Sequence, residues 1–88
     1  MSRVIYFSTP HCNPCIQFKP VCQIVCKNLG LSLDFIDASQ NPQMAHKYGV
    51  TSVPTLVIED GSGVMVKKHT GALPRAQLTS MLSQFSTN

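Results

Sequence analysis

A pair of cysteines separated by two residues lies between two segments of different periodicity, and this arrangement constrains the fold more than any other feature. The pair is Cys12-Asn13-Pro14-Cys15. The apolar run before it, residues 3–7, is rich in β-branched and aromatic side chains and predicts a strand. Residues 13–29 carry apolar side chains at three- and four-residue spacing and predict a helix. A C-x-x-C pair at a strand-to-helix junction is typical of thiol–disulfide exchange.

The chemistry of such a pair follows from its position at a helix start. Helix N-termini favour anions, so the first cysteine tends to ionise near neutral pH. Its thiolate attacks disulfides, and the second cysteine, about one turn further on, closes the ring and releases the product. Cys12 and Cys15 are therefore the candidate catalytic residues and the candidate redox-active disulfide.

The rest of the chain predicts one α/β domain over residues 1–88, because this length is too short for two independent cores. We expect a strand at 31–37, a helix at 43–48 that Asn41-Pro42 begins and Gly49 ends, and a strand at 53–58. A turn at 60–63 joins that strand to another at 64–69, and Pro74 opens a last helix. The order β-α-β-α-β-β-α implies a mixed four-stranded sheet with helices on both faces.

Two apolar stripes predict how the helices pack. Pro20 lies inside the first helix and should bend it. The stripe of this helix consists of Cys15, Phe18, Cys22, Val25, Cys26 and Leu29. The stripe of the last helix consists of Leu78, Met81, Leu82 and Phe85. Cysteine on such a stripe behaves as a small hydrophobic residue, so Cys22 and Cys26 are interpreted as core.

The four cysteines also raise the alternative of a metal or cluster site. Along a helix, Cys26 lies roughly 20 Å from Cys12, which metal–sulfur bonds of about 2.3 Å cannot span. A disulfide between Cys22 and Cys26 is disfavoured because Cβ atoms four residues apart are about 5–6 Å from one another. A metal shared through cysteines of two chains stays open, and the expectation is no metal and no cofactor.

Charge and composition favour no nucleic-acid or membrane partner. The formal net charge is +3, and the densest basic cluster, Lys67-Lys68-His69, alternates between the two faces of a predicted strand. The first apolar segment is too short for a signal peptide or a membrane span. A cytoplasmic, reducing setting is the resulting expectation, and there cysteines are more often catalytic or metal-binding than structural.

Taken together, five separated features resemble the thioredoxin family over nearly the whole chain. They are Cys12-Asn13-Pro14-Cys15, Pro20, Tyr48-Gly49, Val53-Pro54-Thr55 and Gly71-Ala72-Leu73. Compared with full-length members, the chain begins at the family's central strand. The resemblance implies a thioredoxin-like fold, an exposed attacking thiol at Cys12 and a more buried resolving thiol at Cys15.

The same resemblance implies a substrate-binding surface around the cysteines. Val53 would precede a cis peptide bond at Pro54, and its backbone would pair with an extended stretch of the partner. Gly71 would border the same groove, where a missing side chain lets a partner backbone approach. His11, Asn13 and Pro14 complete the predicted surface.

Four positions depart from the family pattern. His11 stands where a tryptophan is usual, and Asn13 where a glycine is common. Tyr6 and Phe35 stand where the family has a buried aspartate and its accompanying lysine. Without that polar pair, the usual proton acceptor for Cys15 is absent. A protonated His11 would stabilise an adjacent thiolate.

These observations predict a small thiol–disulfide oxidoreductase that reduces protein disulfides, works as a monomer, and receives electrons from a thioredoxin reductase or glutathione. A glutaredoxin-like, glutathione-dependent enzyme is the first alternative. A non-catalytic binding module of the same fold is the second, although a binder would need neither thiol of Cys12 and Cys15.

Overall fold

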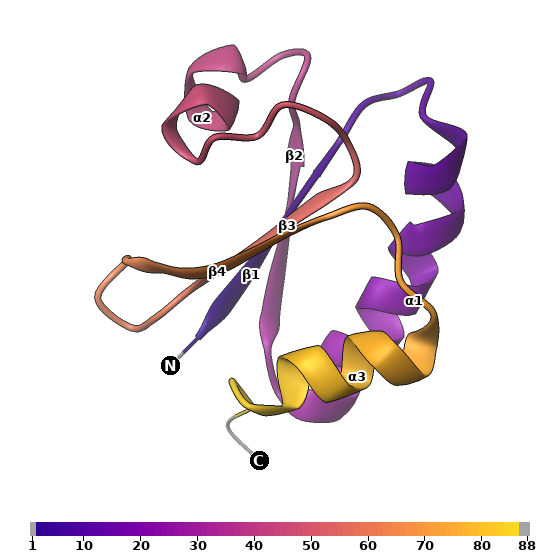
Figure 1. The fold of residues 1–88 in the computed structure, drawn as a ribbon, viewed down its shortest axis with the longest axis vertical. Helices are drawn as coiled ribbons and strands as arrows, with labels where there is room; N and C mark the ends of the chain where they lie inside the picture. Colours follow the sequence, from indigo (N-terminus) through magenta and orange to yellow (C-terminus); the bar gives the residue numbers. More distant parts are fainter. Residues whose placement is uncertain (1, 87–88) are drawn as a thin grey trace.

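The computed structural model describes residues 2–86, whose elements follow the predicted order (Figure 1). They are β1 (Arg3–Ser8), α1 (Asn13–Leu29), β2 (Ser32–Asp37), α2 (Pro42–Lys47), β3 (Thr55–Glu59), β4 (Met65–Thr70) and α3 (Arg75–Ser83). The strands form one sheet in the order β2-β1-β3-β4. β1 and β2 are parallel, and the other two pairings are antiparallel. The predicted α/β fold with a mixed four-stranded sheet is confirmed.

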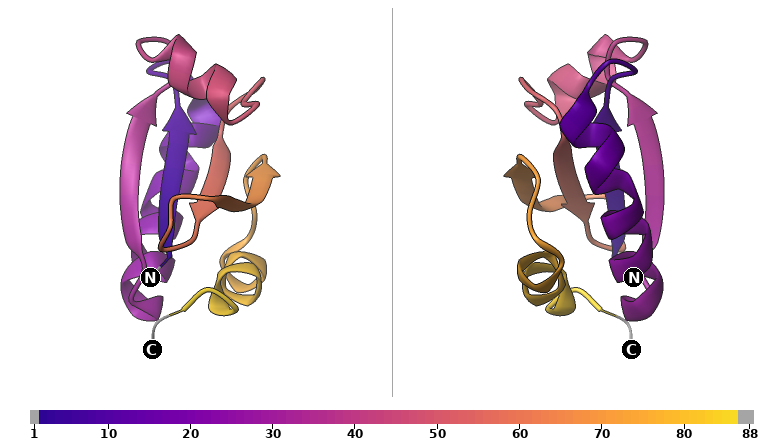
Figure 2. Two further views of the ribbon diagram at one scale, coloured as in Figure 1. Left: turned by 90° about the vertical axis from the view of Figure 1, so that its left-hand side faces the viewer. Right: turned by 90° about the vertical axis from the view of Figure 1, so that its right-hand side faces the viewer.

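Helices cover both faces of this sheet, with α1 and α3 on one face and α2 on the other (Figures 1 and 2). Successive side chains of a strand point to opposite faces, so β1 contributes to two hydrophobic clusters. Val4 and Tyr6 pack beneath α1 and α3, whereas Ile5 and Phe7 pack beneath α2. β1 and β3 therefore form the buried centre of the molecule.

Local sequence explains why α1 begins and ends where it does. Cys12 is the N-cap residue, and a proline occupies the first turn, where a missing N–H removes no helical bond. Gly30 ends the helix with φ +71°, a left-handed conformation that costs glycine little. The predicted stripe is buried except for the half-buried Leu29. The core interpretation of Cys22 and Cys26 is confirmed, since both thiols are fully buried.

The observed boundaries of most elements differ from the predicted ones by one or two residues, and three of these differences bear on the packing or the site. β3 begins at Thr55 and not at residue 53, because Pro54 has no N–H to donate to the sheet. α2 begins one residue early, at Pro42, and the side chain of Asn41 donates to the Asp37 carbonyl without capping the helix. α3 ends at Ser83, so Phe85 packs against the core from beyond the helix.

Candidate active site

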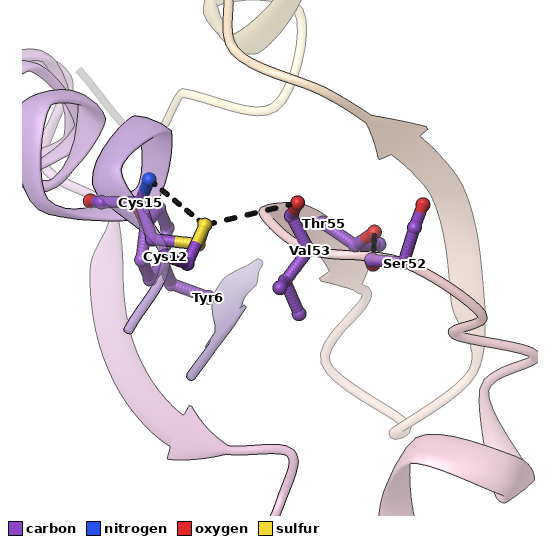
Figure 3. The surroundings of a disulfide bond; sticks show 6 residues. All are labelled: Tyr6, Cys12, Cys15, Ser52, Val53 and Thr55. Atoms are coloured by element: carbon purple, nitrogen blue, oxygen red, sulfur yellow. Dashed lines mark hydrogen bonds between the residues drawn. A yellow bond between two sulfur atoms is a disulfide. The ribbon is translucent and has the colours of Figure 1, made fainter. Parts of the chain in front are cut away.

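Cys12 and Cys15 are joined by a disulfide at the start of α1, with their Cα atoms 5.2 Å apart. Cys12 is half-buried, whereas only 2% of Cys15 is exposed. The backbone N–H of Cys15 donates to Cys12 Sγ over 3.2 Å (Figure 3). In the reduced protein, this N–H and the helix N-terminus would both stabilise a thiolate on Cys12. The pair thus offers one accessible sulfur and one shielded sulfur.

The peptide bond between Val53 and Pro54 is cis, and this segment lies beside the disulfide. The carbonyl oxygen of Val53 lies 3.9 Å from Cys12 Sγ (Figure 3). When Cys12 is reduced, its S–H can donate to this carbonyl. A backbone acceptor next to the accessible sulfur is suited to pairing with an extended partner segment.

Two hydrogen bonds hold the Val53–Pro54 segment where it leads into β3. The Thr55 hydroxyl donates to the Ser52 carbonyl over 2.7 Å (Figure 3), and the Gly71 N–H donates to the Pro54 carbonyl over 2.8 Å. Gly71 has φ +100°, which few other residues adopt, and a Cβ added there would meet nothing within 4 Å. The backbone around Gly71 is therefore open to an approaching chain.

Tyr6 lies beneath the disulfide, on the strand that leads to it. Its ring is fully buried, and its hydroxyl donates to the carbonyl oxygen of Cys15 over 2.6 Å. Burial raises the pKa of Tyr6 to about 12, and the neighbouring Cys22 acts in the same direction. The hydroxyl therefore stays protonated at neutral pH. It donates a hydrogen bond to the first turn of α1 and supplies no base for the Cys15 thiol.

Phe35 contacts Tyr6 edge-on, with ring centroids 5.7 Å apart. The Lys19 ammonium lies 4.6 Å from the centre of the Phe35 ring, so a cation–π contact covers part of this exposed ring. The positive charge next to the Phe35 ring is that of Lys19, on α1. The lysine of the family pattern would instead lie on β2, at the position of Phe35. Tyr6 and Phe35, the two residues that stand in place of the family's polar pair, thus contact each other through their rings.

The other predicted substrate-binding residues surround the disulfide. His11, Asn13 and Pro14 are exposed, Val53 is half-buried, and Pro54 is buried. Their part in substrate binding stays a prediction.

Two hollows lie near the pair, one bordered by Val53 and the other by Pro14, and the sequence predicted neither of them. A hollow of about 410 Å³ extends from Val53 toward α2, and its lining includes Thr9, Ala45, His46, Val50 and Val53. A smaller one, about 220 Å³, is lined by Pro14, Gln17, Phe18, Val21, Ala72 and Leu73. The first hollow combines residues from four separate segments, which no local pattern could reveal.

Cys22 and Cys26 are free thiols with no role in this geometry. Burial raises the pKa of Cys22 to about 12 and that of Cys26 to about 11. Both therefore stay protonated and unreactive at neutral pH. Within residues 2–86, no cluster of three or more histidine, cysteine or acidic side chains could hold a metal. No helix in this part of the chain is long and apolar enough to span a bilayer.

Comparison with known proteins identifies the family. The family profile described as Thioredoxin matches residues 1–84. The chain belongs to the thioredoxin family. Its chemistry is accordingly thiol–disulfide exchange of the thioredoxin type through the Cys12–Cys15 pair.

Individual thioredoxins support this assignment. A putative thioredoxin 2 of Streptomyces coelicolor is 37% identical over 82 residues, which are 92% of this chain and 60% of that protein. The Bacillus subtilis thioredoxin is 35% identical over 81 residues, which are 89% of this chain and 76% of that protein. The solved structure of a mutant thioredoxin from Halobacterium salinarum superposes with a TM-score of 0.89 at 25% identity, covering 99% of this chain and 76% of that one. The chain thus spans less than two thirds of the Streptomyces protein.

Proposed function

We propose that this protein reduces disulfide bonds of other proteins, with Cys12 as the attacking thiol and Cys15 as the resolving thiol. The observation that carries the proposal is the difference between the two sulfurs. Cys12 is half-buried beside the Val53 carbonyl, whereas Cys15 is shielded beneath it. A partner disulfide can approach the first sulfur and not the second.

The reaction consists of two exchanges. The Cys12 thiolate attacks one sulfur of the substrate disulfide, that bond breaks, and the departing substrate thiolate takes up a proton. Cys15 then loses its proton and attacks Cys12 Sγ of the mixed disulfide. The Cys12–Cys15 disulfide forms, and the second substrate thiolate leaves. Two electrons pass from the protein to the substrate, and an external dithiol donor must return them.

Binding of the substrate is proposed to use the surface around the pair. An extended segment of the partner pairs with the backbone of Val53, next to Pro54, and passes over the open backbone at Gly71. The exposed side chains of His11, Asn13 and Pro14 border the other side of the reacting sulfur. Most of the affinity would then come from backbone hydrogen bonds, so many substrate sequences are accepted.

We propose a thioredoxin reductase as the electron donor, in a cytoplasmic setting and with the protein acting as a single-domain monomer. The two buried free thiols, Cys22 and Cys26, fit a reducing compartment, in which cysteines are not driven into disulfides. Turnover with a thioredoxin reductase, measured against turnover with glutathione and glutathione reductase, tests the donor. Faster turnover with glutathione would favour the glutaredoxin-like alternative.

The central test is reduction of insulin with dithiothreitol as the electron source. The protein should accelerate the appearance of insulin B-chain precipitate, and Cys12→Ser should abolish the acceleration. Cys22→Ala is the matched control, because it removes a thiol from the same helix that takes no part in the reaction. This variant should retain activity. Activity that persists in Cys12→Ser would contradict the proposal.

A further inference from the structure

The segment formed by residues 49–54, called the docking segment below, connects α2 to β3 and carries Val53. The end of this segment that leads into β3 is held by the Thr55 hydroxyl and the Gly71 N–H. The other end of the docking segment, which follows α2, is held separately. Two side-chain contacts act there, and neither belongs to the reacting pair.

The first contact is a buried hydrogen bond from Tyr48, the residue before the docking segment. Its hydroxyl donates to Glu59 Oε2, and the other carboxylate oxygen of Glu59 accepts from Arg3 over 2.7 Å. Tyr48 and Glu59 are both buried, with 6% and 4% exposed. The ring of Tyr48 packs on Phe7, with centroids 5.9 Å apart. A buried bond to a charged acceptor is among the stronger hydrogen bonds in proteins, so Tyr48 fixes this end of the segment to β3.

The second contact comes from β4. The Lys68 ammonium donates to the carbonyl oxygen of Gly49 over 3.0 Å. Gly49 has φ +67°, and a Cβ there would lie 3.0 Å from the Lys68 nitrogen. Lys68 therefore holds the first residue of the docking segment close to the sheet. Its neighbour Lys67 points to the opposite face of the strand, away from this contact.

We propose that Tyr48, Glu59 and Lys68 are positioning residues for protein substrates: they hold the docking segment so that the Val53 carbonyl stays beside Cys12. The inference rests on the proposed function, because it concerns how a partner backbone is received. A protein substrate must pair with Val53 and present its disulfide to Cys12 at the same time, so a displaced segment weakens its binding. A small disulfide needs only the thiolate and does not depend on the segment.

The test compares two substrates in single-turnover reactions of pre-reduced protein, quenched with acid and analysed by thiol alkylation. Insulin is the protein substrate, and 2-hydroxyethyl disulfide is the small one. In Tyr48→Phe and in Lys68→Met, the insulin concentration at half-maximal rate should rise about threefold to tenfold, as loss of an ordinary hydrogen bond implies. The limiting rate with insulin, and the rate with the small disulfide, should stay within about twofold.

Lys67→Met is the matched control, since it removes the same charge from the same strand without touching Gly49. It should leave the insulin saturation curve unchanged, and circular dichroism should show all variants folded. The proposal is overturned if neither variant changes insulin saturation, if Lys67→Met matches Lys68→Met, or if both substrates slow equally. Wild-type protein that fails to reduce insulin while reducing the small disulfide would instead refute the proposed function.

Discussion

Raising the pH from 8 to 10 should lower the free energy of unfolding by about 3 kcal/mol, because Cys22 and Cys26 are buried as neutral thiols. In the unfolded chain, a thiol with the ordinary pKa of 9.0 ionises within this range. In the folded protein, burial holds the pKa of Cys22 at about 12 and that of Cys26 at about 11. The unfolded state therefore binds fewer protons than the native state, and stability falls as the pH rises.

The magnitude follows from the populations at pH 10. There, an unfolded thiol is about ten parts ionised to one part protonated, which favours unfolding by about 1.4 kcal/mol for each thiol. Tyr6 adds a smaller loss in the same direction, since its pKa is also raised. A domain of this size is expected to have a total stability of only about 5–10 kcal/mol, so the change is easy to measure.

Urea unfolding followed by circular dichroism at several pH values between 7 and 10 is the assay. The parent protein carries both Cys12→Ser and Cys15→Ser. It has no disulfide with which the thiols of Cys22 and Cys26 could exchange after unfolding. Adding Cys22→Ala and Cys26→Ala should lower stability at pH 7, because packed sulfur atoms are lost. It should also remove most of the decline above pH 8. Parallel declines in the two proteins would refute the assignment of the pH dependence to these thiols.

Three further predictions concern single side chains. Tyr6→Phe removes the hydroxyl that donates to Cys15 and should lower the free energy of unfolding by about 1 kcal/mol. It should not change the shape of the insulin-reduction pH profile between 6 and 9, and a changed shape would mean that Tyr6 takes part in proton transfer. Leu78→Ala empties a fully buried site and should cost about 3 kcal/mol in urea unfolding, whereas a loss under 1 kcal/mol would mean that α3 packs loosely. The hydrogen bond from Tyr48, and after it the hydrogen bond and charge of Arg3, lower the pKa of Glu59. This carboxylate therefore stabilises the fold above its unfolded pKa, and the contribution is lost as the pH falls through the folded pKa. Glu59→Gln should therefore lower stability at pH 7 and flatten its decline below about pH 4.3, and an unaltered acid profile would contradict this role.

Features that depend on neighbouring residues were predictable from the sequence. The bounds of α1, its buried stripe and its ending at Gly30 follow from three- and four-residue spacing and from one glycine. The cysteine pair at the helix start follows from the same local pattern. Predicting that the Val53–Pro54 segment lies beside the disulfide, and that Gly71 lies next to Pro54, required the family resemblance, because no local pattern brings such distant residues together.

Contacts between distant segments could not be predicted. Arg3 and Glu59 are 56 residues apart, and Tyr48 reaches the same carboxylate from the position just after α2. A lysine such as Lys68 resembles any other exposed lysine until its carbonyl partner is known. Tyr6 could be recognised from the sequence as an unusual residue at its position. The hydrogen bond from its hydroxyl to the Cys15 carbonyl could not be predicted, because it depends on how closely β1 and α1 pack.

The placement of the two hydrophobic clusters on opposite faces of the sheet has a consequence for motion. α2 has only six residues and meets the sheet through the smaller cluster, whereas α1 and α3 pack into the larger one. Short elements with few buried contacts open at lower free energy than the whole domain. Amide hydrogen exchange should therefore be faster in α2 than in β1 and β3. Local opening of α2 would leave α1, the helix that carries both reacting sulfurs, folded.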